Sequence, residues 1–152
     1  MDIVSAEQTS LDMALTQTGA KVTSIHGLLC FVRYYIDETE LFYVYNINAK
    51  NQYYLQRVLP YPVGAGIFAK PGDIVEYIKN DIKQFENASN SSNFEEFIET
   101  TQRTHQTVHA IEEVFINYNV PPEKMQEIDT ELSNITNILD DIKNKCVRIV
   151  VV

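Results

Sequence analysis

Cysteine is scarce in this chain, whose 152 residues include only Cys30 and Cys146. Small secreted domains that depend on disulfides carry several pairs of cysteines, because their cores are too small to hold the fold alone. Cys30 lies in an apolar strand pattern and Cys146 at the end of a helical pattern, which does not fit such a framework. We therefore expect reduced thiols and a cytoplasmic protein.

Basic residues are also few, with 12 Lys and Arg against 21 Asp and Glu and a formal charge of −9. This charge would repel phosphate backbones and anionic lipid surfaces, so we expect neither nucleic acid nor a membrane as a partner. The first residues, MDIVSAEQTS, lack the basic region and apolar core of a signal peptide. No later run approaches the roughly 20 apolar residues that span a bilayer.

Recognisable catalytic motifs are missing as well. The sequence has no G-x-S-x-G nucleophile motif, and Cys30 is not at a helix start, where a thiolate would be stabilised. Its paired acids, such as Glu112 and Glu113, are adjacent in sequence, so on a helix they point about 100° apart. These absences predict a protein that is not an enzyme and that needs no cofactor.

What is present is an ordinary globular composition, with 45% apolar and 22% charged residues. A chain of this length is within the usual range of a single domain, so residues 1–152 are expected to form one. Within it the pattern changes near the polar stretch SNSSN, at 89–93. Residues 1–88 indicate an α-βββ-α portion and residues 93–146 a helical hairpin, which together predict the α+β class.

The first portion begins with a short helix that Ser5 caps and Gly19 ends. Three runs rich in β-branched and aromatic residues follow, at 22–37, 41–48 and 52–59, and predict a three-stranded antiparallel meander joined by polar turns. We expect Gly27 to mark a bulge or bend in the first strand. Pro60 and Pro62 end the third strand.

Residues 63–72, VGAGIFAKPG, are expected to form an irregular loop. The segment GAGIFA formally matches a phosphate-binding pattern, but it lacks the strand before it and the helix starting at it that such a site requires. A covering helix is expected to begin at Asp73. Its apolar residues recur at helical spacing and should pack on the sheet; they are Ile74, Tyr77, Ile78, Ile82 and Phe85.

Two long helices are predicted next, at 93–118 and 122–145, separated by the prolines of NVPP. In the second helix, apolar residues alternate steps of three and four, as in a coiled-coil seam. They are Met125, Ile128, Leu132, Ile135, Leu139, Ile142 and Cys146. The tail VRIVVV has strong β character and predicts either a fourth strand at the sheet edge or a strand added to another subunit.

The segment THQTVHAIEE places His105, His109 and Glu112 along one side of a helix, a spacing that permits a metal site. A metalloprotease motif would need Glu directly after the first histidine, where this chain has Gln106. The favoured interpretation is that His105 is a polar residue in the helical seam, which fixes the register, and that His109 titrates in water. The metal site remains a minor alternative.

Nine tyrosines and seven phenylalanines are the most unusual feature of the composition. Many of them follow the predicted strands, where they suit sheet packing, a protein interface or a ligand pocket. The pocket hypothesis places a small molecule between the sheet and the Gly64–Phe68 loop. Its lining would come from Tyr43, Tyr45, Tyr54, Ile67 and Phe68.

Association with another polypeptide is the function that the sequence favours, because the helical seam offers a continuous apolar stripe. The predicted interface residues are Leu132, Ile135, Leu139 and Ile142. A homodimer is the expected arrangement, with an adaptor or regulatory role as the other form of the same hypothesis. The tyrosine pocket and the histidine metal site are the alternatives.

Overall fold

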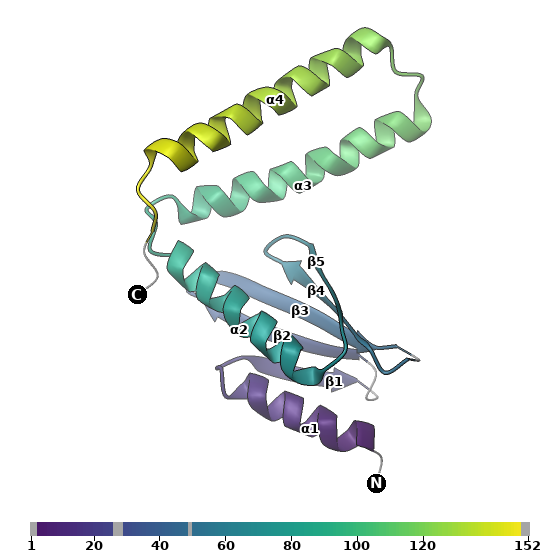
Figure 1. Ribbon diagram of the computed structural model, residues 1–152, viewed down its shortest axis with the longest axis vertical. Helices are drawn as coiled ribbons and strands as arrows, with labels where there is room; N and C mark the ends of the chain where they lie inside the picture. Colours follow the sequence, from purple (N-terminus) through teal and green to yellow (C-terminus); the bar gives the residue numbers. More distant parts are fainter. Residues whose placement is uncertain (1–2, 26–28, 49, 150–152) are drawn as a thin grey trace.

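The computed structural model describes residues 3–25, 29–48 and 50–149 and has the α+β architecture that the sequence predicts (Figure 1). A helix precedes a run of strands, and three helices follow it. The elements are α1 (Ile3–Thr16), β1 (Lys21–Ile25), β2 (Leu29–Ile36), β3 (Thr39–Ile47), β4 (Tyr53–Leu59), β5 (Val63–Phe68), α2 (Pro71–Ala88), α3 (Phe94–Asn117) and α4 (Pro122–Lys145).

The sheet has five antiparallel strands in the order β1-β2-β3-β4-β5, so the prediction of three strands was wrong. The predicted first strand, 22–37, is two strands: Lys21 of β1 pairs with Arg33 of β2, and Ile25 pairs with Leu29. A run that is mostly strand-forming residues, interpreted as a single strand, therefore contains two antiparallel strands. The bulge expected at Gly27 falls at a position outside the described residues.

The expected loop at 63–72 is the other correction, because its first six residues form β5. Tyr54 pairs with Ile67 and Tyr53 with Phe68, while the register shifts between Leu55 and Gln56. Gly66 has a φ of 113°, a conformation that favours glycine. Glycine weakens strands and is typical of loops, which explains why composition pointed away from a strand here.

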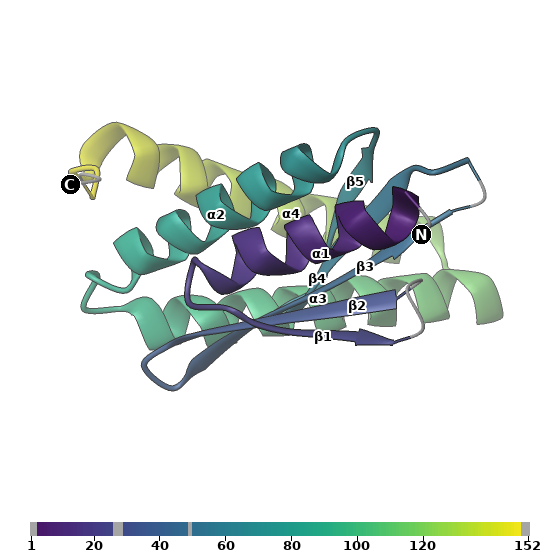
Figure 2. The ribbon, with the colours of Figure 1, turned by 90° about the horizontal axis from the view of Figure 1, so that it is seen from below.

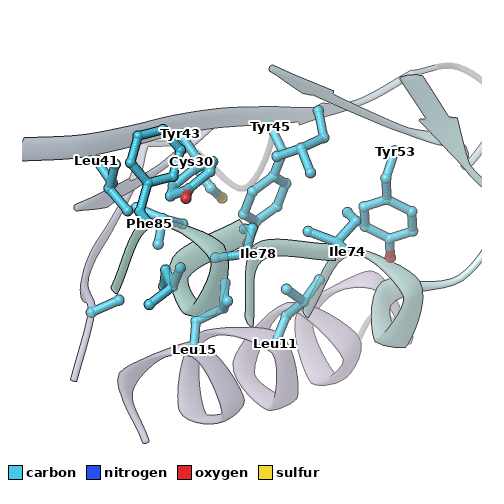
Figure 3. Packing of buried hydrophobic residues seen from close by; sticks show 14 of the residues in the cluster. Leu11, Leu15, Cys30, Leu41, Tyr43, Tyr45, Tyr53, Ile74, Ile78 and Phe85 are labelled. Atoms are coloured by element: carbon cyan, nitrogen blue, oxygen red, sulfur yellow. The ribbon is translucent and has the colours of Figure 1, made fainter. Parts of the chain in front are cut away.

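Helices α1 and α2 both cover the same face of the sheet (Figure 2). From α2 the buried side chains are Ile74, Ile78, Ile82 and Phe85, which confirms the predicted packing of this helix on the sheet. The helix begins at Pro71 rather than Asp73, since proline is well tolerated in the first turn. Leu11 and Leu15 of α1 complete the layer, facing the sheet's tyrosines (Figure 3).

The C-terminal tail carries no strand over residues 147–149. Val147 is 93% exposed and Ile149 is 47% exposed, so neither side chain belongs to the core. The prediction of a fourth strand at the sheet edge is therefore wrong for these three residues, and residues 150–152 lie outside the described part.

Two core tyrosines keep their hydroxyl groups within hydrogen-bonding reach of polar partners. Tyr43 donates to Asp81 of α2 at 2.8 Å, and Tyr45 lies 2.8 Å from Gln8 Nε2 of α1, which donates to it. Burial raises the pKa of Tyr43 far above its usual range, and the negative charge of Asp81 raises it further. Burial is also the main cause that raises the pKa of Tyr45.

These raised pKa values predict a loss of stability at alkaline pH. A tyrosine whose pKa is higher in the folded state contributes stability that is complete below about pH 10, the ordinary pKa. That contribution is lost as pH rises toward the folded value, because the unfolded chain releases its proton first. The loss approaches about 1.4 kcal/mol per pH unit for each tyrosine.

Denaturant unfolding at about pH 8 and about pH 11 checks this expectation. The wild-type chain should lose more free energy of unfolding between the two pH values than a Tyr43→Phe, Tyr45→Phe variant does. A Tyr35→Phe change is the control, since this side chain is 57% exposed. Equal losses in the wild type and the double variant would contradict the prediction.

Candidate protein interface

Helix α3 joins the rest of the molecule through its first half. Phe94 and Ile98 pack against the core cluster, and Phe97 meets Tyr61 edge-to-face with ring centroids 6.2 Å apart. Gln102 donates from Nε2 to the carbonyl oxygen of Pro60 at 2.9 Å. The segment between β4 and β5 is therefore the point at which the helical hairpin is attached.

Tyr61 is the centre of this attachment. Its ring stacks on His105 at 5.5 Å between centroids, and the guanidinium carbon of Arg57 lies 4.6 Å from the centroid of its ring. The same guanidinium lies 4.7 Å from the ring centroid of Phe85. Arg57 and the rings around it thus connect the sheet, α2 and α3.

A buried ion pair holds Arg57 in this position. Its Nη1 lies 2.8 Å from Asp81 of α2, and the two side chains are only 6% and 12% exposed. Asp81 also accepts the hydrogen bond from Tyr43. Nε of Arg57 is buried with no hydrogen-bond partner among the described residues, so this charge depends on Asp81 and on the two rings for its stability.

The distal part of the hairpin is far less covered. Neither α3 nor α4 contains a single buried residue, although each is 24 residues long. Both lie at the opposite end of the molecule from α1 (Figure 1). Long helices in proteins are normally held by packing of an apolar face. Helix α4 has such a face, but none of its residues is buried by the described part of the chain.

A groove of about 650 Å³ runs between α3 and α4. We call it the hairpin groove; its apolar lining is Ile111 of α3 with Ile128, Leu132 and Ile135 of α4. Of these, Leu132 and Ile135 are 50% and 54% exposed. A groove that keeps apolar side chains such as these about half exposed is typical of an interaction site.

The polar lining of the hairpin groove is acidic. It consists of Glu123, Glu127 and Glu131, together with Thr107, Gln126 and Thr130, and includes no lysine or arginine. The three glutamates are four residues apart, so they form a row along one side of α4. Lys124 lies outside the lining and pairs with Glu127 at 2.6 Å on the exposed surface.

All four predicted interface residues lie on this open helix. Leu132 and Ile135 line the hairpin groove, whereas Leu139 and Ile142 continue the apolar stripe toward the end of α4 at 51% and 49% exposure. The structure therefore places the four along one uncovered stripe.

The five predicted pocket residues do not come together. Tyr43 and Tyr45 are 0% and 1% exposed in the core between sheet and helices, where Phe68 also packs, edge-on against Tyr77 of α2. Tyr54 and Ile67 are paired across β4 and β5 and exposed, on the face that α1 and α2 leave uncovered. Residues on opposite faces of one sheet do not line a single cavity.

The histidine site is not assembled either. His105 stacks on Tyr61, and in the described part of the chain no three His, Cys, Asp or Glu side chains gather in an arrangement that could hold a metal ion. Glu112 and His109 are exposed on α3. The contact of His105 is with the β4–β5 segment, so the proposed role as a seam residue facing α4 does not describe it.

Sequence reasoning missed the Arg57, Asp81 and Tyr61 contacts altogether. One sign was available: Arg57 stands two residues after Leu55, so it points to the same face of β4 as that core residue. A charge on a buried face requires an opposite charge. The acid that supplies the opposite charge depends on how α2 lies across the sheet, and the sequence alone does not show this orientation.

No family model, curated protein or solved structure matches this chain. Within the described residues, no helix has both the length and the apolar character needed to cross a membrane.

Proposed function

We propose that the protein acts by association with another polypeptide through the apolar surface of the α3–α4 hairpin. The observation that supports this proposal is the absence of any buried residue in two 24-residue helices whose apolar stripe is continuous. A stripe of this kind normally packs against another surface, and the described residues of the chain provide none. A second copy and a different protein are the two forms that such association can take.

The test introduces charge into the stripe with Leu132→Asp and Leu139→Asp together. The free energy of unfolding of the isolated chain should change by less than about 1 kcal/mol, because exposed side chains contribute little to the fold. Association through the stripe should be lost. Light scattering over a range of concentrations measures association of the chain with itself, the peptide titration described in the next subsection measures association with a different polypeptide, and denaturant unfolding of the same samples measures stability.

The control is Asn137→Asp with Asn144→Asp, which adds the same charges at the same spacing on α4 but outside the hairpin groove lining. It should leave both mass and stability unchanged. If the leucine variant keeps the mass of the wild type and loses several kcal/mol of stability, the stripe packs within the chain. The proposal would then be wrong.

A further inference from the structure

The charge on the hairpin is the feature that indicates what kind of partner it takes. Residues 94–145 contain eleven acidic and four basic side chains, a formal charge of −7 out of −9 for the whole chain. The row of Glu123, Glu127 and Glu131 concentrates part of this charge beside the apolar lining of the hairpin groove. Negative charge and apolar surface are thus offered side by side.

From this combination we infer that the hairpin groove binds a basic amphipathic helix of another protein, with apolar residues on the groove floor and lysines or arginines against the glutamate row. The inference rests on the proposed association and specifies its partner. Amphipathic helices commonly enter apolar grooves between helices, anchored by residues three and four apart. Complementary charge adds specificity and accelerates the encounter.

A second copy of the chain is a poorer occupant of the same surface. Two hairpins that each carry a formal charge of −7 would repel each other on approach. The hairpin groove lining contains no lysine or arginine, among residues that all belong to the described part, so a copy docked in it symmetrically would place glutamates near glutamates. Like charges at an interface oppose binding, whereas a basic segment relieves the repulsion.

The geometry also sets the pattern that the partner should carry. Glutamates four residues apart are separated by about 6 Å along α4, and the row of three extends over about 12 Å. A helix lying along α4 presents side chains at the same interval when its basic residues are four apart. Leucine or isoleucine residues on the adjoining stripe of that helix would meet Ile128, Leu132 and Ile135.

The experiment uses the full chain and a synthetic peptide of about 20 residues, long enough to form a helix. The peptide has leucines alternately three and four apart and lysines four apart on one flank. A second peptide replaces every lysine with glutamate, and a third keeps the lysines but scrambles the leucine spacing. Titration calorimetry at about 50 mM and about 200 mM salt measures binding.

The lysine peptide should bind most tightly and should weaken at the higher salt concentration. Replacing Glu123, Glu127 and Glu131 together with glutamine should reduce its affinity by about tenfold, given the small contribution of each exposed charge pair. The matched control is Glu95→Gln, Glu96→Gln and Glu99→Gln, which removes three exposed charges at the other end of α3. This control should bind like the wild type.

The results separate failure of this inference from failure of the proposed function. Equal binding of the lysine and glutamate peptides, or an unchanged affinity of the glutamine variant, would overturn the basic partner while the association proposal stands. A dimer that Leu132→Asp with Leu139→Asp converts to a monomer would do the same, in favour of a second copy. Failure of every peptide would overturn the basic partner too. The proposed association itself fails only if Leu132→Asp with Leu139→Asp leaves the mass unchanged and lowers the stability by several kcal/mol.

Discussion

Replacing Asp81 with alanine is expected to lower the free energy of unfolding by about 3–5 kcal/mol, as for other broken buried ion pairs. Arg57 would keep its charge in a site where the two side chains are only 6% and 12% exposed, with no anion left beside it. Tyr43 would also lose the acceptor of its hydrogen bond. Denaturant unfolding monitored by circular dichroism measures the loss.

Two further variants identify the cause of the loss at Asp81. Asp140→Ala removes a comparable ion pair on the surface, where Lys143 and Asp140 are 74% and 59% exposed, and should cost at most about 1 kcal/mol. Arg57→Met with Asp81→Leu replaces both charges by apolar groups and should recover much of the stability. If Asp81→Ala costs no more than Asp140→Ala, water reaches Arg57 and the pair is not a structural requirement.

The second large effect is expected at Ile78, in the middle of α2. This side chain is fully buried against the sheet, so Ile78→Ala should lower the free energy of unfolding by about 2–5 kcal/mol through lost apolar contact and the cavity that remains. Urea unfolding of the purified variant measures the change.

Ile135→Ala is the matched comparison, with the same substitution on a helix of the hairpin. Ile135 is 54% exposed, and alanine is the better helix former, so this change should cost less than about 1 kcal/mol. It should instead weaken whatever association the hairpin groove supports. Equal losses at the two positions would mean that α4 packs against the body of the molecule in solution.

Both long helices could be predicted closely from the sequence. The expected bounds of 93–118 and 122–145 compare with Phe94–Asn117 and Pro122–Lys145 in the structure. A polar break precedes the first helix, and prolines separate it from the second. Between these limits the three-and-four spacing of apolar residues has no competing interpretation as a strand.

The strands were harder to predict because the sequence features that separate one strand from the next are local and weak. Gly64 and Gly66 lower the strand tendency of β5, yet its backbone still pairs with β4, and the sequence of a single strand does not reveal that pairing. The run at 22–37 looked like one strand because most of its residues favour strands, and Gly27 was interpreted as a bulge or bend rather than as a sign that the chain reverses. The strand preference of these residues indicates that a strand forms, but it does not show where the chain turns back on itself.

For the candidate site, the sequence identified the apolar stripe but not its surroundings. Periodicity shows which side of a helix is apolar, so Leu132 and Ile135 could be named in advance. It does not show whether another element of the chain covers that side. The row of Glu123, Glu127 and Glu131 was not singled out from the sequence, because its position beside the hairpin groove depends on how α3 and α4 are placed.

The attachment of α3 runs from Phe94 to His105, so the part of the helix beyond His105 projects from the rest of the molecule. From His105, which stacks on the ring of Tyr61, to Asn117 the helix extends about 18 Å. A tilt of α3 by about 10° about His105 would carry its far end through about 3 Å, comparable to half a helical turn. Any displacement of the hairpin tip would bear first on the ring of Tyr61, which Arg57 also contacts.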